Sequence, residues 1–313
     1  MPLDARIKSW LAKAAPPQID WKAGVAEARN QFWRTMQRLE ADAPTLHGVR
    51  NLTVPRTEAG PENTLKARLY EPFAAGAARG AGLIYFHGGG FVLGDLESHD
   101  MLCRRLAAAA MIRVLSVEYR LAPEHKFPAA VEDAAAAVRW AFANAPELAF
   151  DPARIAIGGD SAGGNLAAVT AQAFKKAGAP RLKAQLLFYP CTQLMLMTPS
   201  QMRLRESYFL TQAAQDFFKD KYLRSREDAF DVRCSPLLEN DLAGLPPTYL
   251  VTAGFDPLYD EGKAYGEKLA ACGVPVAHEH YPRQVHGFFN MTAISPAARE
   301  AIEAAGAWLS ARL

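Results

Sequence analysis

Short apolar runs of β-forming residues alternate along most of this chain with longer stretches rich in alanine and leucine. The candidate strands are LKARLY (65–70), GLIYFH (82–87), RVLSVEY (113–119), RIAIGG (154–159), AQLLFY (184–189), TYLVTAG (248–254) and VAHEHY (276–281). Between them, residues 127–145 carry apolar side chains at helical spacing, and residues 162–178 form a second helical pattern that ends at Gly178. This alternation predicts an α/β fold, with a mostly parallel central sheet flanked by helices on both faces.

Two stretches stand outside the alternation. The first is residues 1–45, where Trp21, Val25, Phe32, Met36 and Leu39 form a helical stripe with no strand after it. The second is 195–235, which contains SYFLTQAAQDFFKDKYL. We predict a catalytic core made of residues 46–194 and 236–313, and a helical cap in which the two outer stretches pack together as a lid. The alternative is that both are ordinary peripheral helices that bury one apolar face.

The composition limits the kinds of molecule that we expect this protein to bind. The 313 residues are half hydrophobic and carry a net charge of only +2, without a long basic run, so we expect no nucleic acid. The four cysteines lie far apart without a CxxC pair, which indicates incidental thiols. The N-terminus has charges where a signal peptide would be apolar, and no run is long enough to cross a membrane. We therefore expect a cytoplasmic protein that acts on a small molecule, without a membrane partner.

The segment GDSAG (159–163) matches the pattern G-x-S-x-G between a β-run and a helical run. In that context Ser161 is expected on a sharp strand-to-helix turn, where its hydroxyl projects from the sheet, and flanking side chains would collide with the turn. The alternative is a glycine-rich turn that the serine merely caps. Walker-type phosphate binding is disfavoured because no G-K-[ST] follows the glycines.

A serine nucleophile needs a base within hydrogen-bonding reach and an acid that orients the base. Among the histidines after Ser161, His286 lies in a loop beyond the last candidate strand, whereas His278 and His280 lie within that strand. We predict His286 as the base and give little weight to a metal site at the two strand histidines. For the acid we favour Asp256 over Asp260, although Asp256 before Pro257 also suits a helix N-cap.

The sequence HGGGF (87–91) follows another candidate strand. Glycines bring bare backbone N–H groups close to a substrate, where they stabilise the oxyanion of acyl transfer, and the N–H of Ala162 would complete such a hole. A simple hairpin turn is less consistent, because FVLGD does not alternate back as a partner strand.

Taken together, HGGGF, YRLAPEHKFPAA (119–130), GDSAGGNLA (159–167), DPLYDEG (256–262) and HGFF (286–289) closely resemble the hormone-sensitive-lipase-like branch of α/β-hydrolase carboxylesterases, also called bacterial family IV, over residues 65–310. The resemblance implies an α/β-hydrolase fold with a helical cap. The catalytic triad that it implies is Ser161, Asp256 and His286. The oxyanion donors that it implies are Gly88, Gly89 and Ala162, with His87, Gly90 and Asp160 as supporting residues. The cap segments carry no motif that matches the family, so Phe91 and Tyr208 are named as pocket residues without that support.

These observations predict a serine carboxylesterase that cleaves short- to medium-chain esters through an acyl-enzyme, with no metal or organic cofactor. The resemblance also suggests a homodimer formed through the edge of the last strand. One alternative is a non-catalytic small-ligand receptor, like the gibberellin receptors of this branch that have lost the histidine base. Another is an amidase or lactonase, since the same groups serve all three reactions.

Overall fold

The central element is an eight-stranded sheet with the order β1-β2-β4-β3-β5-β6-β7-β8. This computed structural model describes the chain except for residues 14–18, 57–62, 75–77, 179 and 207. The strands are β1 (Gly48–Pro55), β2 (Thr64–Glu71), β3 (Gly80–Phe86), β4 (Arg113–Glu118), β5 (Phe150–Asp160), β6 (Gln185–Phe188), β7 (Thr248–Phe255) and β8 (Val276–Val285). Neighbouring strands are parallel from β4 to β8, whereas β2 is antiparallel to both β1 and β4. The predicted mostly parallel sheet is confirmed.

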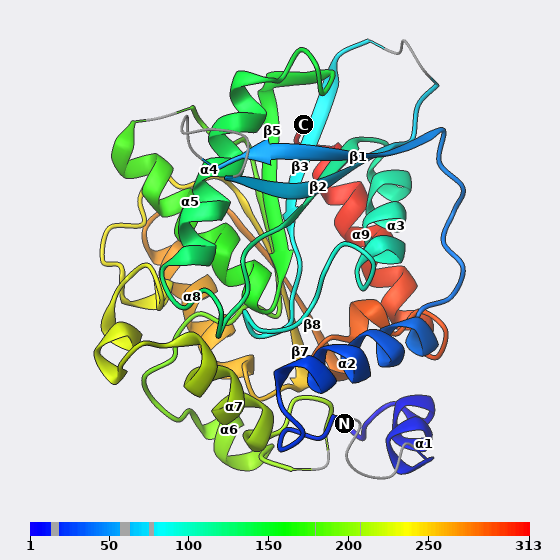
Figure 1. The fold of residues 1–313 in the computed structure, drawn as a ribbon, viewed down its shortest axis with the longest axis vertical. Helices are drawn as coiled ribbons and strands as arrows, with labels where there is room; N and C mark the ends of the chain where they lie inside the picture. Colours follow the sequence, from blue (N-terminus) through cyan, green and yellow to red (C-terminus); the bar gives the residue numbers. More distant parts are fainter. Residues whose placement is uncertain (14–18, 57–62, 75–77, 179, 207) are drawn as a thin grey trace.

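Helices cover both faces of the sheet. The α-helices are α1 (Ala5–Lys13), α2 (Val25–Leu39), α3 (Asp100–Ala110), α4 (Ala129–Ala143), α5 (Ala162–Ala177), α6 (Pro199–Arg203), α7 (Gln212–Tyr222), α8 (Tyr259–Ala271) and α9 (Pro296–Ser310), and three 3₁₀ turns are η1 (Arg226–Phe230), η2 (Pro236–Leu238) and η3 (Phe288–Asn290). In Figure 1, α4, α5 and α8 lie on one face and α3 and α9 on the other. α5 ends as predicted, with Gly178 in the left-handed conformation.

The sequence prediction missed β1. Its residues are mostly exposed or half-buried, and Val54 is the buried one. The strand pairs with β2 along its full length at the edge of the sheet. An edge strand that buries so little shows neither a continuous apolar run nor a clear alternation, so backbone pairing holds it in place more than side-chain burial does.

The two stretches outside the alternation gather beyond the carboxyl ends of the parallel strands, where α1, α2, α6 and α7 lie together at the lower edge of Figure 1. Trp21 joins them, because its ring lies 5.0 Å from that of Phe217 and 5.3 Å from that of Phe218. A second contact pairs Trp10 with Phe209 at 6.1 Å. These ring contacts join the two stretches, and their assignment as a cap that acts as a lid stays a prediction.

The four cysteines are free, and Cys103, Cys191 and Cys234 are buried. Within the described ranges, the helices include none that combines the length and the apolar character needed to cross a bilayer.

Glu40, just after α2, provides a test of the electrostatics of this fold. Both of its carboxylate oxygens are buried, and no described residue donates a hydrogen bond to them. Burial, reinforced by the charge of Asp100, raises the pKa of Glu40 from 4.5 to about 9. Between these values the folded protein keeps a proton that the unfolded chain has released, so its free energy of unfolding falls as the pH rises.

We expect Glu40→Gln to remove this penalty. The variant should gain stability over the wild type by up to about 1.4 kcal/mol for each pH unit between pH 5 and pH 8. Urea unfolding of both proteins at several pH values measures the gap, with Glu279→Gln on the exposed face of β8 as the control. A gap that stays constant across this range contradicts a protonated Glu40.

Candidate active site

Ser161 lies in the turn between β5 and α5, with backbone angles φ 54° and ψ −116°. A positive φ is costly for a residue with a side chain, and such strain is tolerated at functional turns that the surrounding structure holds tightly. The flanking glycines make the turn possible. A Cβ on Gly163 would lie 1.9 Å from the carbonyl oxygen of Phe86, and a Cβ on Gly159 would lie 2.4 Å from the backbone of Gly163. The pattern G-x-S-x-G therefore satisfies a packing requirement between β3, β5 and α5.

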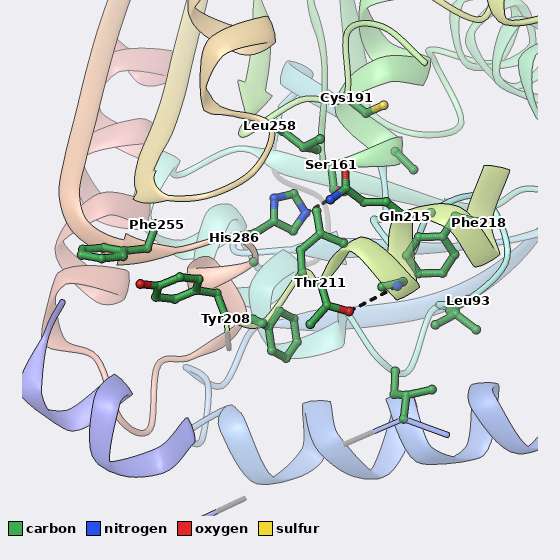
Figure 2. Close-up of a pocket in the computed structure, with 18 of the residues that line it drawn as sticks. Leu93, Ser161, Cys191, Tyr208, Thr211, Gln215, Phe218, Phe255, Leu258 and His286 are labelled. Carbon is green, nitrogen blue, oxygen red and sulfur yellow. Dashed lines mark hydrogen bonds between the residues drawn. The ribbon is translucent and has the colours of Figure 1, made fainter. Parts of the chain in front are cut away.

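The loops after β7 and β8 bring two further groups to Ser161. His286 Nε2 lies 2.8 Å from Ser161 Oγ, and His286 Nδ1 lies 2.9 Å from Asp256 Oδ2. Asp256 has no exposed surface, and its other oxygen accepts a hydrogen bond from the N–H of Leu258. The three residues that the sequence singled out thus form one continuous hydrogen-bonded chain, drawn in part in Figure 2.

The other residues considered for the acid and the base form contacts away from Ser161. Asp260 accepts a hydrogen bond from the N–H of Ser200, which ties α8 to the beginning of α6. His278 and His280 both contact the hydroxyl of Thr252 on β7, away from Ser161. The N-cap interpretation of Asp256 is wrong, because α8 begins at Tyr259 and Asp256 instead closes a turn onto Leu258.

The glycine loop differs from the prediction at one position. Gly88 was expected to donate its N–H to the oxyanion, but this N–H donates to Asp160 Oδ1 at 3.0 Å. A Cβ on Gly88 would also lie 2.3 Å from the same carboxylate. The assignment of Gly88 as a donor is therefore wrong. None of the hydrogen bonds among the described residues uses the N–H of Gly89 or Gly90, and both residues line the cavity above Ser161.

Asp160 holds the loop from below. Its Oδ1 also accepts a hydrogen bond from the Tyr85 hydroxyl at 2.7 Å, and His99 Nε2 lies 3.5 Å from Oδ2. Burial opposes the charge of this carboxylate, but His99 and the Tyr85 hydroxyl outweigh it, so the pKa of Asp160 is lowered. The negative charge of Asp160, the residue directly before Ser161, therefore anchors the Gly88 N–H.

His87 and the YRLAPE segment support the same loop. The His87 ring stacks on Tyr119 at 4.4 Å, and the Tyr119 hydroxyl donates to the His87 carbonyl. Burial lowers the pKa of His87 to about 4, so its ring is neutral at pH 7. Glu124 pairs with Arg29 of α2, and Arg29 also donates to the carbonyls of Val92 and Ala122. His87 is not among the described residues that line the cavity, in agreement with a supporting role.

A cavity of about 1240 Å³ opens above Ser161 and His286. Phe91 and Tyr208, the two predicted pocket residues, both line it. So do residues of α1, α2 and α7, and of the loops at Cys191, Tyr208 and Leu258. Figure 2 shows Gln215 and Phe218 extending from α7 into this space. The sequence analysis did not single out these two residues, because the cap segments carry no motif and side chains at helical spacing do not reveal which face meets the core.

Among the described residues, no three His, Cys, Asp or Glu side chains come close enough together to hold a metal ion. The arrangement around Ser161 consists instead of a hydroxyl, an imidazole and a carboxylate in hydrogen-bonding contact, beside backbone N–H groups that are free among the described residues.

Comparison with known proteins agrees with this geometry. A family model described as alpha/beta hydrolase fold matches residues 83–290. The carboxylic ester hydrolase LipN of Mycobacterium tuberculosis is 45% identical over 255 residues, which cover 79% of this chain and 66% of LipN. The ethyl acetate hydrolase of Pseudomonas putida is 39% identical over 88% of this chain and 86% of its own length.

Solved structures give the same result. A hyperthermophilic esterase from the archaeon Pyrobaculum calidifontis superposes with a TM-score of 0.93 at 39% identity and covers 99% of each chain. The chain belongs to the α/β-hydrolase fold family, within its hormone-sensitive-lipase-like group of carboxylesterases.

Proposed function

We propose that this protein is a serine carboxylesterase that hydrolyses short- to medium-chain esters through an acyl-enzyme intermediate. The observation that carries the proposal is the hydrogen-bonded chain from Ser161 through His286 to Asp256 at the base of the cavity. A serine hydroxyl at neutral pH becomes an effective nucleophile when a positioned imidazole takes its proton.

In the first half of the reaction, Ser161 Oγ attacks the ester carbonyl carbon while its proton passes to His286 Nε2. Asp256 accepts the hydrogen bond from His286 Nδ1 and stabilises the imidazolium that forms. The tetrahedral intermediate collapses, the carbon–oxygen bond to the alcohol breaks, and His286 gives its proton to the departing alkoxide. Water then attacks the acyl-enzyme with His286 again as base, which releases the acid and restores Ser161.

The oxyanion requires donors that are free and close to Ser161. We assign this role to the N–H groups of Gly89, Gly90 and Ala162. Ala162 opens α5, so its N–H has no partner within the helix, and the positive end of the helix dipole adds to its effect. Donors of this kind are each worth about 3–4 kcal/mol in the transition state. Asp160 and His87 then act as positioning residues for the loop that carries Gly89 and Gly90.

The cap is assigned to residues 1–45 and 195–235, over a core of 46–194 and 236–313. Support comes from the cavity itself, which both outer segments line in part. Covering the site in this way shields the reacting groups from bulk solvent and limits the acyl chain that fits. The activity named for the Pseudomonas putida relative, hydrolysis of ethyl acetate, supports a preference for short acyl chains.

The receptor alternative loses support because His286 is present and hydrogen-bonded to both partners. The test uses p-nitrophenyl esters from acetate to palmitate, together with the serine-directed reagent diethyl p-nitrophenyl phosphate. We expect the highest kcat/KM on short to medium chains. We also expect one equivalent of nitrophenolate per chain from the reagent, with the adduct on the peptide that contains Ser161. A folded protein that neither hydrolyses an ester nor reacts at Ser161 would refute the proposal.

A further inference from the structure

The face of α7 that meets the cavity carries an unusual set of polar groups. Gln215 is 6% exposed, and its side-chain Nε2 is buried without a hydrogen-bond acceptor among the described residues. In Figure 2 the side chain of Gln215 extends from α7 toward Ser161 and His286. A buried amide without a partner is costly, so it is retained where a ligand supplies the missing acceptor.

Two further polar side chains follow Gln215 along the same face of α7. Lys219 and Tyr222 stand one and two turns beyond Gln215 and also line the cavity. The Tyr222 hydroxyl belongs to a side chain that is only 1% exposed, and it finds no partner in the described part of the chain. Lys219 is half-buried, and none of the ion pairs between described residues includes it. We call Gln215, Lys219 and Tyr222 the α7 donor row.

No described acid forms a hydrogen bond or an ion pair with the α7 donor row, although the charge of Lys219 acts on the carboxylate of Glu261. The buried carboxylate of Glu261 is held by the N–H groups of Thr192, Gln193 and Gln201. Glu206 also borders the cavity, but its side chain is exposed. The apolar residues Leu194, Leu210 and Leu258, which line the same cavity, carry no acceptor on their side chains. The α7 donor row therefore presents hydrogen-bond donors, one of them cationic, to a ligand in the cavity.

The position of His286 indicates whether the acyl half or the alcohol half of the ester lies along α7. The alcohol must leave beside His286 Nε2, which returns the proton, and the lining residues on that side include Phe209, close to Gly287. The glycine loop that carries the proposed oxyanion donors instead contacts α7. A Cβ on Gly90 would meet the ring of Phe218 of α7, and Phe91 stacks on Tyr222 at 3.9 Å. The acyl chain, which extends away from the leaving group, thus runs along α7.

We propose that the α7 donor row selects esters whose acyl chain carries a second oxygen function. A terminal carboxylate fits best, as in the half-ester of a dicarboxylic acid. Gln215 and Tyr222 donate hydrogen bonds to the acceptor oxygens, and Lys219 supplies the charge that distinguishes a carboxylate from a neutral ester. This inference rests on the proposed esterase function and specifies its substrate class.

The experiment compares three substrates with the same leaving group. They are p-nitrophenyl hemiglutarate, methyl p-nitrophenyl glutarate and p-nitrophenyl 5-methylhexanoate, in which an isopropyl group replaces the carboxylate with nearly the same shape. The readout is the ratio of kcat/KM values between substrates for one protein preparation, because that ratio does not depend on the fraction of folded enzyme. The variants are Gln215→Leu and Lys219→Met.

Two controls lie on the same helix outside the cavity lining. Gln212→Leu removes an amide that donates to Asp216, and Lys221→Met removes a cation paired with Asp220. Neither should change the ratios.

We expect Gln215→Leu to lower the preference for both oxygenated esters over the alkyl ester by about tenfold. Lys219→Met should lower the preference for the hemiglutarate alone by a similar factor. If the ratios in Gln215→Leu and Lys219→Met stay within about twofold of the wild type, while hydrolysis of all three esters depends on Ser161, the inference is overturned and the esterase function stands. If the wild type hydrolyses none of the three esters, the proposed function fails and this inference falls with it.

Discussion

Replacing Ser161 by alanine is expected to lower kcat for ester hydrolysis by roughly five orders of magnitude. The substitution removes the one oxygen that attacks the carbonyl, and no neighbouring group can replace it, because His286 has been positioned to act through that oxygen. The residual rate should come from the oxyanion donors and from substrate binding, which persist without the nucleophile. The protein should stay folded, since alanine meets the same backbone angles with a smaller side chain.

The measurement is steady-state hydrolysis of p-nitrophenyl butyrate, with circular dichroism and thermal unfolding to show that the variant is folded. Ser9→Ala, at an exposed position on α1, is the matched control and should keep wild-type kcat. Loss of reaction with diethyl p-nitrophenyl phosphate should accompany the loss of hydrolysis. A folded Ser161→Ala protein that keeps more than about one hundredth of the wild-type kcat would show that another residue is the nucleophile.

The second large effect is expected from Gly163→Ala, and it acts on folding. The new Cβ would lie 1.9 Å from the carbonyl oxygen of Phe86 and 2.7 Å from that of His87. Both contacts are with backbone atoms at the end of β3, so no side chain can rotate away, and α5 or β3 must shift. We expect the free energy of unfolding to fall by about 3 kcal/mol or more. The same shift would displace Ser161 from His286 and reduce activity.

Gly262→Ala in the first turns of α8 provides the comparison. There the nearest atom to a new Cβ lies 3.6 Å away, which is ordinary contact distance. Because alanine is the better helix former, this variant should be neutral or stabilised by up to about 1 kcal/mol. Urea unfolding of both variants and the wild type gives the two differences directly. Equal stability of Gly163→Ala and Gly262→Ala would contradict the packing argument for the serine turn.

The chemical groups of the site could be predicted from the sequence because each belongs to a local pattern. Ser161 lies between glycines at a strand-to-helix boundary, and Asp256 and His286 each follow the carboxyl end of a candidate strand. In a parallel sheet those ends meet at one edge, so position in the chain implies position in space. The same reasoning did not predict the order of the strands in the sheet. It also left out β1, whose stability depends on pairing with β2.

The orientation of individual groups was decided by the tertiary structure alone. Gly88, Gly89 and Gly90 are chemically identical in the sequence, and the Gly88 N–H is excluded as an oxyanion donor because the buried carboxylate of Asp160 reaches it first. In the cap, too, the tertiary structure decides the direction of individual side chains. The spacing in α7 indicates a helix with one buried face, yet only the packing of that helix over the nucleophile directs Gln215 into the cavity. Local sequence thus determined the fold class and the candidate site residues, whereas long-range packing determined which backbone donors are free and which side chains line the pocket, because a hydrogen bond depends on the direction of approach of distant segments.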